Sequence, residues 1–336
     1  MLRWLPPRPA QQTGRHPFGE SGAAFARPVS AVATAAPTSR GGRPLAPAST
    51  DGRQHARWRA IRTNSALLVG AAIVGGLVVL SVFGPLIYRV DPLDQALRTR
   101  LAPPIWAGGS TTNPFGADGF GRDVLARLLE GGRVSIGISA AAIVVACLIG
   151  VPLGLAAGYL RGQPENIIMR LADAQQALPG VLLAIIIVAV TGASVLNLIV
   201  VLAISGWSVY TRLVYGVVRS LRVREFVLAA ETIGSPPWRV MLHHVLPNML
   251  TPIVVLATLQ VARMIQAEAA LSFLGLGVPP PDPSWGSILT DGQKVIFSTP
   301  WVATIPGVAI FIAVLGVNLL GDGIRRLLDP RSQVSS

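Results

Sequence analysis

The sequence predicts an all-α membrane protein that crosses the bilayer several times. Of its 336 residues, 51% are hydrophobic and only 13% are charged, whereas charged residues make up about 25% of a typical soluble domain. The apolar residues gather in long uncharged runs, which is typical of helices that span a membrane. Six crossings, with both ends of the chain in the cytoplasm, fit the runs and the distribution of arginine.

Residues 1–60 are predicted to form a disordered cytoplasmic tail. They are rich in Pro, Ala, Gly, Ser and Arg and show no periodic apolar pattern, so they lack the apolar surface that a packed core requires. Residues 1–64 hold ten arginines against Glu20 and Asp51. These arginines either bind anionic lipid headgroups or simply keep the tail solvated. A transit peptide is a weaker interpretation, because the prolines leave no clear amphipathic helix.

The uncharged runs that follow the tail divide the chain into membrane helices. The run Ala66–Tyr88 is long enough for one crossing, and with an extracytoplasmic stretch it makes up the segment 61–133. The run 174–211 is about twice as long as one crossing, and we divide it at the turn residues 191–194. The core 134–330 is therefore predicted to contain five further helices, near 134–160, 174–191, 195–211, 249–274 and 295–321.

The arginines predict how these helices are oriented. With a cytoplasmic N-terminus, the inside segments hold 20 of the 28 basic residues; these segments are 1–64, 161–173, 212–244 and 324–336. In the outside segment 89–133, six arginines are nearly balanced by five carboxylates. Because loops rich in Lys and Arg remain in the cytoplasm, the opposite orientation is disfavoured.

The sequence also argues against several kinds of site. A phosphate-binding loop needs Gly-Lys followed by Ser or Thr, but the only lysine, Lys294, stands between Gln293 and Val295. Cys147 is the only cysteine, so a disulfide framework is excluded. Two adjacent histidines on a helix point in different directions, so no metal site is expected at His243 and His244.

The polar segment 212–248 carries the most specific pattern in the chain. Ala229 and Ala230 favour a short helix, Gly234 can adopt the positive φ that ends it, and Leu246-Pro247 leads back to the membrane. Trp238 supplies an apolar anchor of the kind found at interface centres. A basic amphipathic loop that lies on the membrane surface is the alternative interpretation.

This spacing resembles the cytoplasmic coupling loop of bacterial ABC-importer permeases, which reads Glu-Ala-Ala, three residues, Gly, nine residues and Ile-x-Leu-Pro. Leu228 stands where the family has Glu, and His244 stands where it has Ile. Three further regions resemble the C-type permease subunit of the dipeptide, oligopeptide and nickel importers. They are Asn113–Ser135, Leu271–Gly277 with Pro283–Gly286, and Met169–Asp173 with Leu178-Pro179.

The resemblance implies a type I ABC-importer permease fold in the bacterial inner membrane and transport of dipeptides or oligopeptides by alternating access. It also implies a homologous B-type permease, two ATP-binding subunits that hold ATP and Mg, and an extracytoplasmic binding protein. No cofactor of its own, no catalysis and no nucleic acid are expected for this chain. The residues expected to couple it to the ATPases are Ala229, Ala230, Gly234, Trp238, Leu246 and Pro247.

Two charged residues in the fifth predicted helix are candidates for the translocation path. A charge inside the membrane costs about 2.5–3.5 kcal/mol on insertion scales, so Arg263 is expected to face either the path or an acidic partner. Glu268 lies toward the outer end, where a structural role is favoured. In the second predicted helix, four glycines at helical spacing indicate a close packing face; they are Gly137, Gly150, Gly154 and Gly158.

Other functions remain as alternatives. The same group of importers also carries nickel, glutathione and other small solutes. An ion-coupled secondary transporter would be expected to place acids or histidines along its pathway, and the apolar runs contain almost none. A membrane enzyme is disfavoured, because no His/Asp/Glu cluster has ligand spacing and no Gly-x-Ser-x-Gly is present.

Overall fold

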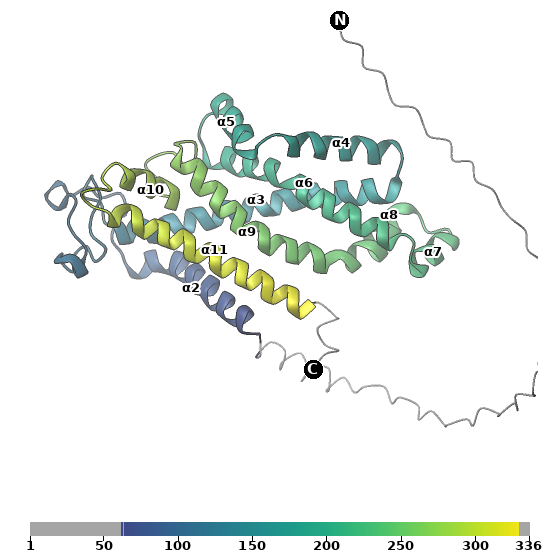
Figure 1. Cartoon of the computed structure of the whole chain (residues 1–336), viewed down its shortest axis with the longest axis horizontal. Coiled ribbons are helices and arrows are strands. Elements are labelled where there is room, and N and C mark those ends of the chain that lie inside the picture. The colour runs from purple at the N-terminus through teal and green to yellow at the C-terminus, as the bar shows by residue number, and fades with distance from the viewer. Residues whose placement is uncertain (1–61, 63, 329–336) are drawn as a thin grey trace, which may run out of the picture. The chain divides into compact units, whose positions relative to one another are not determined.

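The computed structural model describes residue 62 and residues 64–328, and this part of the chain is mostly helical (Figure 1). Among these residues, the only pairing of extended backbone is an isolated antiparallel bridge between Ala117 and Asp123. The predicted all-α class is therefore confirmed. The tail predicted over residues 1–60 lies outside the described residues.

Five stretches of helix are long and apolar enough to cross a membrane. They are α2 (Ser65–Ile87), α3 (Val124–Leu160), α6 (Val195–Leu221), the stretch Pro237–Phe273 that ends in α9 (Leu250–Phe273), and α11 (Trp301–Leu328). A sixth candidate consists of α4 (Gln163–Ala177) and α5 (Gly180–Thr191), which meet at a bend of 90°. This number agrees with a polytopic membrane protein.

The bend between α4 and α5 differs from the single helix predicted near 174–191. Leu178 has an extended backbone with ψ of 129°, because the ring of a following proline disfavours the helical conformation. Pro179 also lacks the N–H that would continue the helical hydrogen bonds. Helix α4 therefore ends at Ala177, near the start of the run 174–211, and lies alongside α6 (Figure 1).

Other helix boundaries also differ from those predicted. Helix α3 begins ten residues before position 134, because the Asp123 carboxylate accepts a hydrogen bond from the Ala126 N–H (2.7 Å) and caps it. Helix α6 continues beyond residue 211 to Leu221. The last helix starts at Trp301 rather than at 295, and a separate short helix precedes it, α10 (Trp285–Gln293).

The helices pack in pairs that determine where functional segments lie. Helix α3 packs along α6, and α2 lies beside α11 (Figure 1). At one end lie two short helices of the segment that joins α6 to α9, α7 (Glu225–Thr232) and α8 (Pro237–Arg239). At the opposite end lie α10 and the connection 88–123 (Figure 1). We call these ends the α7 end and the α10 end.

Candidate functional site

The predicted coupling segment forms a chain of short helices at the α7 end. After α7, Gly234 adopts the left-handed conformation with φ of 81°. Its N–H bonds to the Glu231 carbonyl (3.0 Å), and the Ser235 N–H bonds to the Ala230 carbonyl (3.1 Å). This pair of bonds satisfies the last carbonyls of the helix. The chain then turns through Pro236 into α8, and a π-helical turn (Val240–Val245) and a 3₁₀ turn (Leu246–Met249) lead into α9.

A polar contact ties α7 to the adjacent end of α3. The Tyr159 hydroxyl donates a hydrogen bond to the Glu231 carboxylate (2.7 Å). The Arg222 guanidinium donates to the Tyr159 carbonyl and lies over the Tyr159 ring, 5.0 Å from its centre. Its Nε is 4.0 Å from the Glu231 carboxylate. The acid in α7 therefore holds the segment against the membrane helices.

Beneath this contact, the coupling segment is anchored by apolar packing. Val227 of α7 and Val240 of the π turn are fully buried. They pack with Val214 and Val218 of α6 and with Leu155 of α3 in one cluster. Burial of this kind contributes about 1.5–3 kcal/mol for each large aliphatic side chain. The segment is consequently a folded extension of the helix bundle.

The outer surface of the coupling segment remains apolar. Five large side chains are exposed there, and we call them the docking face: Phe226, Leu228, Ile233, Trp238 and Leu242. Ile233 is 82% exposed and Trp238 is 55% exposed. Exposed apolar side chains next to charged residues are typical of a surface that contacts another protein or a membrane.

The six residues predicted to contact the ATPases divide into two groups. Ala229, Gly234, Trp238 and Pro247 are exposed at the α7 end. Ala230 is only 5% exposed and Leu246 is partly buried, and both pack against the apolar cluster beneath the segment. Ala230 and Leu246 therefore support the segment from within, whereas the other four are accessible to a partner.

The two candidate path residues of α9 lie in different surroundings. Arg263 is exposed on the helix surface and donates a hydrogen bond to the buried Gln260 amide oxygen (3.2 Å). Glu268 is fully buried, and the Ser272 hydroxyl donates to one of its carboxyl oxygens (2.7 Å). The other carboxyl oxygen has no hydrogen-bond partner among the described residues. In this conformation, only Arg263 reaches a surface.

A buried ion cluster at the α10 end joins residues far apart in the sequence. Asp118 is fully buried and accepts from the guanidinium groups of Arg122 (2.7 Å) and Arg127. Both arginines also contact Asp291 of α10, at 3.0 and 3.1 Å. No sequence signal links Asp291 to Asp118 and Arg122, because these positions lie far apart in the chain.

A second polar contact lies beside this cluster. The Tyr88 hydroxyl donates to the Asp123 carboxylate (3.1 Å). Burial, together with the Asp123 charge, raises the pKa of Tyr88 to about 12. Burial also raises the pKa of Asp123, although the hydrogen bonds that this carboxylate accepts oppose the shift. The contact fixes the end of α2 to the start of α3.

A metal site has no support in the described part of the chain, where no three His, Cys, Asp or Glu side chains are grouped so that they could hold an ion. His243 and His244 lie in the π turn, the first exposed and the second partly buried.

Comparison with known proteins assigns these features to a family. Residues 150–334 match the family described as "binding-protein-dependent transport system inner membrane component", and residues 54–104 match the N-terminal transmembrane domain of oligopeptide transport permease C. The dipeptide transport system permease protein DppC of Alkalihalophilus pseudofirmus is 39% identical, with 82% of this chain and 88% of that protein covered. The glutathione transport system permease protein GsiD of an Escherichia coli strain is 38% identical, with 82% and 90% covered.

A solved structure shares the fold. The MetNI methionine ABC transporter in inward-facing conformations matches with a TM-score of 0.51 and 17% sequence identity. The match covers 60% of this chain and 97% of that chain.

Proposed function

We propose, from the premise that this chain belongs to the family of inner-membrane components of binding-protein-dependent transport systems, that it moves dipeptides and oligopeptides into the cell by alternating access. The chain is a multi-pass permease subunit of an ABC importer and does not itself carry out catalysis. The single observation that supports the peptide cargo best is its match to a dipeptide permease over 82% of this chain.

The energy for transport is proposed to come from separate ATP-binding subunits that hold ATP and Mg. The only lysine of this chain, Lys294, lacks the glycine and hydroxyl neighbours of a phosphate-binding loop. The remaining proposed partners are a homologous permease subunit and an extracytoplasmic binding protein. Together, these subunits would alternately open a central path to the two sides of the membrane.

The docking face is proposed to be the surface that receives the ATP-binding subunit. Large exposed aromatic and aliphatic side chains are typical of the residues that dominate binding energy at an interface. Leu228, which is 48% exposed, replaces the acid of the family pattern, so this contact would be apolar in this chain. The Tyr159–Glu231 hydrogen bond would transmit movement of the docked subunit to α3.

The α7 end is proposed to lie in the cytoplasm, together with both termini. Arginines are concentrated in the segments that this orientation places inside, whereas those of segment 89–133 are nearly balanced by acids. The α10 end would then face the binding protein.

Arg263 is proposed to line the translocation path. It is exposed in the middle of an apolar helix, and a guanidinium in hydrocarbon is costly unless it faces water or a partner. A peptide carboxylate is a suitable partner because it can accept two hydrogen bonds from one guanidinium. Glutathione is the second candidate cargo, because a relative is named for it and it is also a peptide-like acid.

The coupling role is tested by Trp238→Ala in the complete transporter. Truncation of a central interface tryptophan costs about 2 kcal/mol or more, which weakens association roughly 30-fold. We therefore expect loss of the ATP-binding subunits during purification and loss of vanadate-sensitive uptake of a labelled dipeptide.

The matched control is Trp106→Ala, since Trp106 is also exposed (64%) but belongs to the connection 88–123. If both variants retained the ATP-binding subunits and uptake equally, the docking face would not be the coupling surface. If the wild-type transporter showed no vanadate-sensitive dipeptide uptake, the proposed function itself would be wrong.

A further inference from the structure

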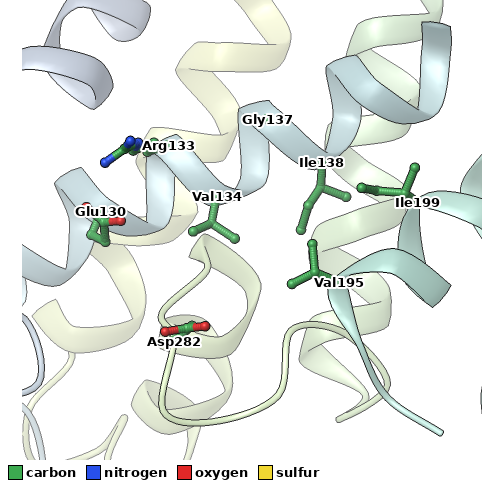
Figure 2. Close-up of a pocket in the computed structure, with 8 residues that line it drawn as sticks. All are labelled: Glu130, Arg133, Val134, Gly137, Ile138, Val195, Ile199 and Asp282. Atoms are coloured by element: carbon green, nitrogen blue, oxygen red, sulfur yellow. The ribbon is translucent and has the colours of Figure 1, made fainter.

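A cavity of about 300 Å³ opens at the α10 end of the membrane helices (Figure 2). It lies between the first turns of α3, the start of α6 and the connection that follows α9. Six of the residues that line it are Glu130, Arg133, Val134, Val195, Ile199 and Asp282. A volume near 300 Å³ is at the lower limit for sites that bind small molecules.

The cavity has a charged end and an apolar end. Figure 2 shows Glu130, Arg133 and Asp282 toward one end, and Val195 and Ile199 toward the other. Helix α3 also contributes Gly137, where an added Cβ would meet no atom within 4 Å, so the wall is open at this position. The arrangement suits a ligand that presents its charged groups on one side and an apolar group on the other.

The three charged side chains at this cavity have no ion pair or hydrogen bond among the described residues. Other charged residues at the α10 end are paired, because Arg127 contacts both Asp118 and Asp291 in the buried cluster. Arg133 and Asp282 are exposed and Glu130 is partly buried, so all three charges are accessible to a ligand of opposite charge at the mouth of the cavity. Two carboxylates favour a cation, and one guanidinium favours a carboxylate.

We propose that this cavity is an entry site for the peptide substrate. Glu130 and Asp282 attract its terminal ammonium group, Arg133 attracts its terminal carboxylate, and the wall around Val195 accepts an apolar side chain. This inference rests on the proposed function. It places the first contact of the peptide, after its release from the binding protein, at the α10 end. The site is distinct from Arg263, which lies deeper in α9.

The test uses cysteine labelling of the complete transporter in spheroplasts. Cys147 is the only cysteine, so Cys147→Ala provides a background for Val195→Cys inside the cavity. The matched control is Phe297→Cys, because Phe297 is fully exposed between α10 and α11. Each variant is treated with a cationic and an anionic methanethiosulfonate reagent. Labelling is repeated while the binding protein delivers alanyl-leucine in the presence of ATP.

For each cysteine we compare the rate of labelling by the cationic reagent with the rate of labelling by the anionic reagent. We expect this ratio of rates to be roughly two- to fivefold larger for Val195→Cys than for Phe297→Cys, since exposed charge pairs contribute modestly. Glu130→Gln with Asp282→Asn should remove this preference. Delivered alanyl-leucine should slow labelling of Val195→Cys and leave Phe297→Cys unchanged.

Two results would overturn the inference while leaving the proposed function intact. The first is unprotected labelling of Val195→Cys during normal dipeptide uptake. The second is a cysteine at 195 that reacts in the isolated subunit but not in the complete transporter, which would mean that the partner permease covers the cavity. Absence of dipeptide uptake by the wild type would instead refute the proposed function.

Discussion

Replacement of Gly154 by alanine should destabilise the contact between α3 and α6. Gly150, Gly154 and Gly158 face α6, and the two helices approach so closely that no side chain fits between them. A Cβ on residue 154 would lie 2.6 Å from the Val214 Cβ and 2.7 Å from the Thr211 carbonyl oxygen. Carbon atoms normally pack about 3.5–4.0 Å apart, so the helices would have to separate locally by roughly 1 Å.

The magnitude follows from the cost of overpacking. Added methyl groups in a well-packed interior typically cost about 1–3 kcal/mol, and small residues are what allow membrane helices to pack closely. Each kcal/mol corresponds to about 2–4 °C in Tm for a domain of about 150–250 residues. We therefore expect Gly154→Ala to lower the Tm by several degrees.

The assay is thermal unfolding of the purified subunit in detergent, followed by tryptophan fluorescence. Gly216→Ala on α6 is the matched control, because a Cβ at that position meets nothing within 4 Å. Alanine there should be neutral or slightly stabilising, since it has a higher helix propensity than glycine. Equal Tm values for the two variants would refute the close α3–α6 packing on which the reasoning depends.

Three further changes address the polar contacts. Tyr159→Phe removes the hydrogen bond to Glu231, and bonds to charged groups contribute about 1.5–3 kcal/mol. Limited proteolysis should therefore cut the α7 segment faster. Unchanged cleavage would argue that this bond does not hold α7 against α3. Asp118→Asn removes one of the two charge partners of the buried Arg127 and leaves only Asp291. A loss of up to about 3–5 kcal/mol should appear as a lower Tm, whereas an unaltered Tm would contradict it. The pKa of Tyr88 is about 12 in the folded protein and about 10 in an unfolded chain. The contribution of this hydroxyl to the free energy of unfolding is therefore complete below pH 10 and falls as the pH rises toward 12. Tyr88→Phe should therefore show a weaker decline in Tm above pH 10 than the wild type, and parallel curves would count against the predicted shift.

The glycines of α3 show how far sequence reasoning reaches. Four glycines at helical spacing predicted one packing face, and the structure places three of them against α6. Gly137 instead opens onto the cavity at the α10 end. The repeat identifies which residues share a helix face, but the partner of that face is decided by the position of another helix.

The coupling segment shows the same division. Its pattern correctly predicted a short helix, ended by Gly234 with a positive φ, because these features depend on the local preferences of alanine and glycine. The burial of Ala230 and the pairing of Glu231 with Tyr159 depend on the end of α3, 72 residues away in the sequence. The sequence therefore identified the segment, and the structure separated its anchoring residues from its exposed ones.

The sequence by itself determined the helical class and the approximate positions of most membrane runs, since a backbone in lipid must satisfy its own hydrogen bonds and does so within each helix. Only the tertiary structure decided the 90° course of α4 and α5, the burial of Glu268 and the cluster that joins Asp118 to Asp291. The physical reason is that hydrogen bonding within a helix is local, whereas burial and ion pairing are set by helices brought together from distant parts of the chain.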